Sequence, residues 1–342
     1  MKLSLKLLAL TLAICGLSAQ PASAGITIDT VLVENIGNAN DGTGYGGVSY
    51  AYHIGKYEVT INQYTAFLNA VAKTDTYNLY NTSMGSDLNI AGITRSGVSG
   101  SYVYTAVNGG DRPITYVGWF DAARFVNWLQ NGQPNGLQVA GVTETGTYAL
   151  NGAVSGVGFT RDINADFSLP SENEWYKAAY YDQSLSGGGG GYWLYPTANN
   201  SVPNSRNGSA SDPNSANFFR DDGIANGFNG GYAVNNSLAP PAGNALTTVG
   251  AFSLADSFYG TFDQGGNVWE WNEAVIGASL GIRGGSWSGN ETALRSSTRS
   301  SFSPANQSAI VGFRISYVPE PGAFALMAVG LALLAWARKR TL

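Results

Sequence analysis

The chain has a single cysteine, Cys15, and a single histidine, His53, among its 342 residues. Zinc sites of the common kinds and three-histidine iron sites need more thiolate or imidazole ligands than this chain carries. His53 alternates with apolar neighbours, as a residue on a strand does, so we expect it to be structural. Cys15 lies in an N-terminal segment that we expect to be removed, so the mature chain is expected to have no thiol and no disulfide.

Basic side chains are also few. Five of the 18 lysines and arginines lie in the two terminal segments, so residues 25–317 keep 13 basic side chains against 22 acidic ones, a formal net charge of −9. A surface of this sign repels phosphate backbones, and no lysine–arginine cluster interrupts it. Nucleic acid is therefore not expected as a partner. Apolar residues make up 44% of the chain, which is enough to fill a core.

The first 24 residues resemble a secretory signal peptide. They carry Lys2 and Lys6, an apolar run over residues 7–17, and the small residues Ala22-Ser23-Ala24 of a cleavage site. The mature chain is therefore expected to begin at Gly25, outside the cytoplasm. The alternative, an N-terminal membrane anchor, is disfavoured because a span needs about 20 apolar residues.

Residues 318–342 form a second terminal signal. Val318-Pro319-Glu320-Pro321 precedes an apolar run over residues 322–337, and Arg338-Lys339-Arg340 follows. The segment resembles the Pro-Glu-Pro C-terminal sorting signals of Gram-negative bacteria that make exopolysaccharide. The resemblance implies transient membrane anchoring by the C-terminal helix, cleavage by a sorting protease at the inner membrane, and release to the cell envelope or the extracellular space. A permanent C-terminal anchor uses the same residues and stays the alternative.

Residues 25–317 show no internal repeat and no break in composition, so we expect one domain. Residues 26–59 are typical of strands joined by glycine-rich turns, with a strand over residues 48–54. Residues 77–108 are expected to form a hairpin or loop, and residues 182–256 are rich in glycine, asparagine and serine and are expected to be irregular.

Three helices are expected within this domain. Thr60 begins the first and forms a capping box with Gln63, ahead of an apolar face. The second runs over residues 117–129 and ends at the Asn131-Gly132 pair. Ser171 and Glu174 form a capping box for the third.

Six motifs follow one another along most of residues 50–316. They are Gly55-Lys56-Tyr57-Glu58-Val59-Thr60, Arg112-Pro113-Ile114 with the helix that contains Trp119, Leu169-Pro170-Ser171-Glu172-Asn173-Glu174-Trp175, Gly266-Asn267-Val268-Trp269-Glu270-Trp271, Arg283-Gly284-Gly285-Ser286-Trp287 and Gly312-Phe313-Arg314. Taken in order, they resemble the sulfatase-modifying-factor, or formylglycine-generating-enzyme, domain. The resemblance implies a single irregular, loop-rich α+β domain with a C-type-lectin-like core and calcium-stabilised loops.

The redox chemistries of this family conflict with the composition. Its oxidases hold copper(I) through a cysteine pair, and the matching interval here, Trp287 to Leu294, contains no cysteine. Soft thiolates select copper(I), and nothing in the interval replaces them. Its iron enzymes need a set of histidines that His53 alone cannot supply. Neither copper nor iron is therefore expected.

Calcium is compatible with the sequence, because it prefers carboxylate and carbonyl oxygens. By resemblance, one family site falls on the side chains of Asp263 and Glu270 and the carbonyls of Gly266 and Val268. For Glu270, a buried ion pair with an arginine, Arg283 or Arg314, stays the alternative.

A second family calcium site falls, by resemblance, on Asn217 and the carbonyl of Phe218. Its acidic ligand is not identified by the motif. Asp221 and Asp222 are candidates because they lie close by in the sequence.

Three residues are expected to line the groove in which relatives bind substrate. Arg295 and Arg299 match family arginines near this groove, and Trp287 is an aromatic residue suited to a sugar or peptide. Structural ion pairing of the arginines and core packing of the tryptophan are the alternatives.

These observations favour an exported, non-catalytic peptide- or glycan-binding or structural module connected with exopolysaccharide. One alternative is a formylglycine-generating-type oxidase or another protein-modifying enzyme of the family. Another is a hydrolase that uses a pair of carboxylates drawn from Asp263, Glu270 and Glu273. No catalytic residue is assigned.

Overall fold

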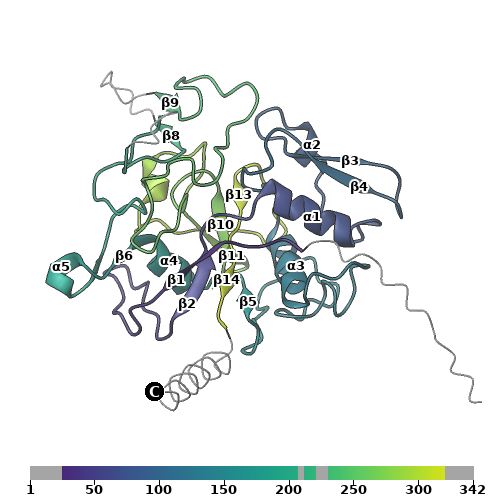
Figure 1. The fold of residues 1–342 in the computed structure, drawn as a ribbon, viewed down its shortest axis with the longest axis horizontal. Helices are drawn as coiled ribbons and strands as arrows, with labels where there is room; N and C mark the ends of the chain where they lie inside the picture. Colours follow the sequence, from purple (N-terminus) through teal and green to yellow (C-terminus); the bar gives the residue numbers. More distant parts are fainter. Residues whose placement is uncertain (1–24, 207–211, 221–229, 320–342) are drawn as a thin grey trace, which may run out of the picture.

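The computed structural model of the protein describes residues 25–206, 212–220 and 230–319 (Figure 1). The predicted signal peptide and most of the predicted sorting segment lie outside these residues, as do Asp221 and Asp222. Within them, no helix has both the length and the apolar character needed to cross a membrane.

The structure contains short helices and short strands joined by long irregular segments. The helices are α1 (Ile61–Val71), α2 (Ser83–Ser86), α3 (Trp119–Gln130), α4 (Glu172–Tyr180) and α5 (Leu185–Gly188), with a 3-10 turn η1 (Glu291–Leu294). The strands are β1 (Thr30–Val33), β2 (Tyr52–Gly55), β3 (Ile93–Ser96), β4 (Val103–Ala106), β5 (Phe167–Ser168), β6 (Tyr181–Asp182), β7 (Gly191–Tyr192), β8 (Phe219–Arg220), β9 (Gly231–Tyr232), β10 (Trp269–Ile276), β11 (Ser279–Arg283), β12 (Ser300–Phe302), β13 (Val311–Gly312) and β14 (Ser316–Tyr317).

Two four-stranded sheets lie at the centre, in the orders β1-β2-β14-β5 and β12-β11-β10-β13. In Figure 1, α1, α3 and the β3–β4 hairpin lie on one side of these sheets, and α4 and α5 lie on the other. The last strand, β14, pairs with both β2 and β5, so that Tyr317 lies opposite His53 and Phe167. The final residues of the domain are therefore built into the sheet that contains its first strands.

The first helix forms as the sequence predicts. Thr60 accepts the backbone N–H of Gln63, and the Gln63 side chain accepts the N–H of Thr60, which completes the capping box. The apolar face of α1 is buried against α3, where the rings of Phe67 and Phe125 lie 5.4 Å apart and edge to face. Phe125 makes a similar contact with Phe313, which joins the helices to the end of the chain.

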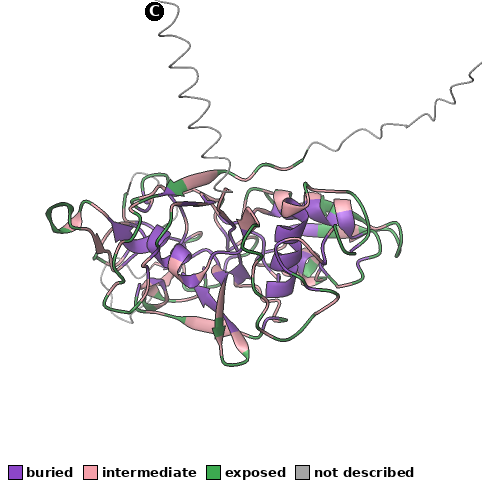
Figure 2. Ribbon diagram, turned by 90° about the horizontal axis from the view of Figure 1, so that it is seen from below, coloured by how far each residue is buried: buried purple, intermediate pink, exposed green. Residues whose placement is uncertain are grey.

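The second predicted helix is α3, and it is buried along nearly its whole length (Figure 2). At its start, the Asp121 carboxylate accepts the N–H of Gly118 at 2.7 Å, and burial raises the pKa of Asp121 to about 7. At its end, Asn131 caps the helix and Gly132 adopts a positive φ of 79°, a conformation that glycine favours. The prediction of this stop is therefore confirmed.

The prediction of one irregular α+β domain is also confirmed, whereas one predicted strand is shorter than expected. The sequence predicts a strand over residues 48–54, but β2 covers only Tyr52–Gly55. The preceding residues belong to a glycine-rich loop that packs on α4, where Gly46 donates its N–H to Asn173 at 3.1 Å. The alternation of apolar residues did not reveal this contact, because its partner lies far away in the sequence.

Candidate functional site: a buried acidic cluster

An ion pair between Glu270 on β10 and Arg314, which lies between β13 and β14, occupies the centre of the domain. Arg314 donates from Nε to Oε2 of Glu270 at 2.6 Å and from Nη2 to Oε1 at 2.7 Å, and neither side chain is exposed. The indole of Trp175 on α4 donates to Oε2 at 2.7 Å. Of the alternatives left by the sequence for Glu270, the structure contains the pair with Arg314.

Arg314 also holds two other segments of the chain in place. Its Nη1 donates to the carbonyl of Gly55 at 2.9 Å and to that of Lys56 at 3.4 Å, and its Nη2 donates to the carbonyl of Phe262 at 2.9 Å. All five guanidinium N–H groups are therefore used. The segment after β2 and the segment before β10 meet at this side chain.

Two further carboxylates lie in the electric field of this pair. Glu58 is only 2% exposed, yet neither of its carboxylate oxygens has a hydrogen-bond partner within the described residues. Burial raises the pKa of Glu58 well above its usual value, and the charge of Asp263 raises it further, whereas Arg314 opposes this. Asp263 accepts the N–H of Gly250 at 2.5 Å, and burial raises its pKa to about 6.

The segment predicted to bind calcium, residues 263–270, is a tight turn that leads into β10. Asp263 has a φ of 59° and Gly266 a φ of 86°, both in the left-handed region. A side chain at Gly266 would collide with the carbonyl of Asn217, since the distance would be 2.2 Å, so glycine is required here. The structure thus brings Asn217, from the second predicted calcium site, next to the first.

The remaining residues of the two predicted calcium sites are buried around this turn. Val268 is fully buried in a cluster with Leu246 and Trp287. The side chain of Asn217 donates to the carbonyl of Ala245 at 2.9 Å, and the Phe218 carbonyl accepts the hydroxyl of Ser205.

The carboxylate oxygens of Glu58, Asp263 and Glu270 meet some of the requirements of a calcium site, but not all of them. In the part of the chain that the structure describes, no three His, Cys, Asp or Glu side chains are grouped to hold a metal. Arg314 and Trp175 fill three of the roughly four lone-pair sites of Glu270 and leave one on Oε1. Asp263 keeps Oδ1 and Glu58 keeps both oxygens, and carboxylate and carbonyl oxygens are the ligands that calcium prefers.

The three predicted groove residues all make contacts within the protein. Trp287 is 7% exposed, and its indole donates to the carbonyl of Ala309 at 3.2 Å. Arg295 donates to the hydroxyl of Tyr195 at 3.0 Å. Arg299 forms an ion pair with Glu172 and keeps a side-chain exposure of 33%. Of the three, Arg299 is therefore the one that reaches furthest into solvent.

A second ion-pair network joins the start of α4 to β10, and the motifs did not reveal it. Arg161 pairs with Glu174 at 2.9 Å and with Glu273 at 2.7 Å. The hydroxyl of Tyr148 donates to Glu273 at 2.6 Å, and that of Tyr50 donates to Glu174 at 2.8 Å. Because Arg161 and Glu273 both lie outside the six motifs, only the tertiary structure identifies Arg161 as the partner of Glu273 and of the motif carboxylate Glu174.

The chain matches two known sequence families. Residues 47–317 match the Sulfatase-modifying factor enzyme 1-like domain, and residues 318–340 match the PEP-CTERM protein-sorting motif. No curated protein matches the chain. The sorting motif indicates recognition by a sorting protease and export through the inner membrane to the cell envelope or the extracellular space.

Several solved structures are similar to the chain. Treponema denticola variable protein 1 has a TM-score of 0.47 at 19% identity and covers 85% of this chain and 95% of its own. CarF has the same TM-score and identity, with 85% and 98% covered. PvdO from Pseudomonas aeruginosa has a TM-score of 0.38 at 16% identity, with 85% and 91% covered.

Proposed function

Since the chain belongs to the sulfatase-modifying-factor family and ends in a sorting motif, we propose that it is an exported, non-catalytic module that binds a peptide or a glycan. The observation that carries this proposal is the interval Trp287 to Leu294, where the family's oxidases place their copper ligands and this chain has no cysteine. A domain that keeps the family's fold without its copper ligands can still bind a ligand on its surface, but it lacks the metal that the oxidation needs.

Two of the three carboxylates considered for a hydrolase are paired with arginines, so any pair drawn from the three includes at least one of them. Glu270 is paired with Arg314 without exposure to solvent, and Glu273 is paired with Arg161. A general acid or a nucleophile has to reach its substrate, which a carboxylate in a closed ion pair does not do. These contacts support a structural role for both residues and favour binding over hydrolysis.

The sorting motif also supports a functional link to exopolysaccharide, because it resembles the C-terminal sorting signals of bacteria that make such polymers. A glycan is accordingly the first ligand class to test, and an extended peptide is the second. Arg299, which is the most accessible of the predicted groove residues, is expected to contact either ligand.

The proposed function is tested with the purified exported protein on glycan and peptide arrays and in an oxygen-consumption assay with copper and a cysteine peptide. We expect saturable binding on an array and no copper-dependent oxygen uptake above the protein-free control. Arg299→Ala is expected to weaken binding about tenfold, since it removes roughly 1.4 kcal/mol of interaction. Copper-dependent turnover of the peptide, or no binding on either array, would contradict the proposal.

We also propose that a structural calcium ion stabilises the turn over residues 263–270, with Asp263, the carbonyls of Gly266 and Val268, and the remaining lone pair of Glu270 as its ligands. Calcium in excess of its Kd by a factor of about 100 stabilises a folded state by about 2.7 kcal/mol. The melting temperature is therefore expected to fall by about 5 °C or more when EGTA replaces calcium. Equal melting curves in the two buffers would exclude this calcium site.

A further inference from the structure

Glu58 is a buried carboxylate without a partner, and its surroundings have too few positive charges. Besides burial, the charges of Asp263 and Glu270 raise the pKa of Glu58 and the charge of Arg314 lowers it. Among these three carboxylates, Arg314 donates hydrogen bonds only to Glu270. With all of them ionised, this cluster carries two uncompensated negative charges. Burying unpaired charges costs several kcal/mol each, so burial drives these carboxyl groups toward their protonated forms when no cation is present, and a bound cation would stabilise their ionised forms instead.

Hydrogen bonds to backbone groups hold the segment that carries Glu58 next to the segment that carries Asp263. The carbonyls of Gly55 and Lys56 and that of Phe262 all accept from Arg314, and Phe262 donates its N–H to Lys56 at 2.9 Å. The residues just before Glu58 are therefore tied to the residue just before Asp263.

Gly250 completes this junction between the two segments. Its N–H binds Asp263, and it adopts a φ of 70° with its Cα packed on the ring of Tyr57, where a side-chain carbon would lie 2.6 Å from the ring. The chain on both sides of the Glu58–Asp263 pair is therefore fixed in position.

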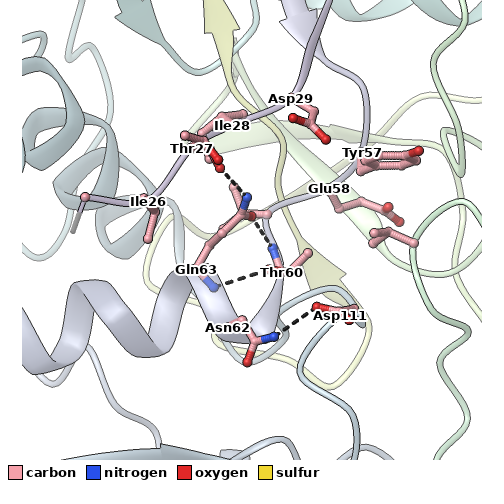
Figure 3. A pocket seen from close by; sticks show the side chains of 13 residues that line it. Ile26, Thr27, Ile28, Asp29, Tyr57, Glu58, Thr60, Asn62, Gln63 and Asp111 are labelled. Carbon is pink, nitrogen blue, oxygen red and sulfur yellow. Dashed lines mark hydrogen bonds between the residues drawn. The ribbon is translucent and has the colours of Figure 1, made fainter.

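A cavity of about 450 Å³ connects this region with the surface (Figure 3). Glu58 and Val249 line it, together with Asp29 and Asp111, and no lysine, arginine or histidine is among its described lining residues. Asp29 and Asp111 are exposed, so they add negative charge at the entrance. The cavity therefore offers a cation a path from solvent to Glu58 along a lining whose charged side chains are all acidic.

From these observations, we infer that Glu58 is a ligand of a divalent cation that it shares with Asp263, while Glu270 is kept for Arg314. The two excess negative charges match the charge of one calcium ion, and Glu58 alone contributes two free oxygens to the six to eight that calcium takes. This inference rests on the proposed calcium ion and moves its second carboxylate ligand from β10 to the segment between β2 and α1. The ion thereby ties the N-terminal part of the domain to the turn before β10.

The inference is tested by calcium titration of the exported protein, followed by calorimetry and by the shift in melting temperature. Glu58→Gln is expected to lower calcium affinity at least 100-fold, because it removes a charged ligand from a buried site. Asp111→Asn is the matched control: it removes a carboxylate from the same cavity at an exposed position, and is expected to change the affinity less than threefold. In EGTA, Glu58→Gln is expected to melt at or above the wild-type temperature, because it removes a buried carboxyl group that has no hydrogen-bond partner and is costly to ionise there.

The outcomes of this titration test the proposed calcium ion and the role of Glu58 as its ligand separately. If the wild type responds to calcium and Glu58→Gln responds with equal affinity, Glu58 is not a ligand and the inference fails, while the proposed calcium ion stands. If the wild type does not bind calcium, both fail. A variant that melts well below the wild type in EGTA would also overturn the inference, because Glu58 would then stabilise the cation-free fold.

Discussion

Replacing Arg314 with methionine is expected to lower the free energy of unfolding by about 3–5 kcal/mol, which is enough to unfold many domains at 37 °C. The variant leaves Glu270 in a fully buried place without its counter-ion and beside two other carboxylates, Glu58 and Asp263. It also removes the donors to the carbonyls of Gly55 and Phe262. Chemical denaturation followed by circular dichroism measures the loss.

Two further variants show whether this loss comes from the stranded charge. Arg314→Met combined with Glu270→Gln is expected to recover part of the stability, because the buried partner is then neutral. Arg295→Met is the control, since Arg295 is partly exposed and its side chain donates to Tyr195; a loss of about 1 kcal/mol is expected there. An Arg314→Met variant as stable as Arg295→Met would show that the buried pair contributes little.

Replacing Arg161 with methionine is expected to cost about 2–4 kcal/mol at pH 7. The expected cost is smaller than for Arg314 because the Arg161 side chain is 21% exposed, so solvent screens part of the interaction. Burial alone would raise the pKa of Glu174, but the charge and hydrogen bonds of Arg161 outweigh it and lower this pKa below its usual value. Thermal unfolding across a pH series measures the effect.

The pH dependence distinguishes this ion pair from simple packing by the arginine side chain. A carboxylate whose pKa is lowered by folding stabilises the protein above its unfolded-state pKa of about 4.3, and this stabilisation is lost as the pH falls through the folded-state pKa. The loss of stability caused by Arg161→Met is therefore expected to become smaller toward pH 4, where Glu174 of the variant is protonated and no longer carries a buried charge. Arg95→Met is the control: it breaks one 3.4 Å ion-pair contact with Asp75 and removes the guanidinium from the rings of Tyr80 and Tyr102, and a loss of about 1 kcal/mol is expected. A deficit of equal size at both pH values would contradict the ion-pair explanation.

Local signals in the sequence predicted α1, α3 and α4, but not the four-residue helices α2 and α5. The Thr60–Gln63 and Ser171–Glu174 capping boxes mark where α1 and α4 begin, because both partners of each box lie within one turn of the chain. The buried face of α1 follows from helical spacing alone. The short strands were harder to predict, since a two-residue strand such as β5 or β13 exists only through its partner and leaves no pattern of its own.

The partners of the buried carboxylates were harder still to predict from the sequence. The motif around Glu270 predicted a buried carboxylate. Whether an arginine or a metal ion faces this carboxylate depends on Arg314, which lies 44 positions later in the chain. Glu58 belongs to a motif used for the family resemblance, yet nothing in its neighbourhood marks it as a carboxylate without a partner. Its isolation became visible only when the segments around Asp263 and Arg314 were placed beside it.

By itself, the sequence determined the family, the C-terminal sorting motif, the starts of α1 and α4, the end of α3 and the shortage of thiol and imidazole ligands for copper or iron. Each of these depends on residue types or on contacts within a few residues, which a linear pattern contains. The tertiary structure decided which arginine faces which carboxylate and which carboxylate is left over. Charges in a buried cluster interact over a few ångströms of space between segments distant in the chain, so only folding brings Glu58, Asp263 and the Glu270–Arg314 pair together.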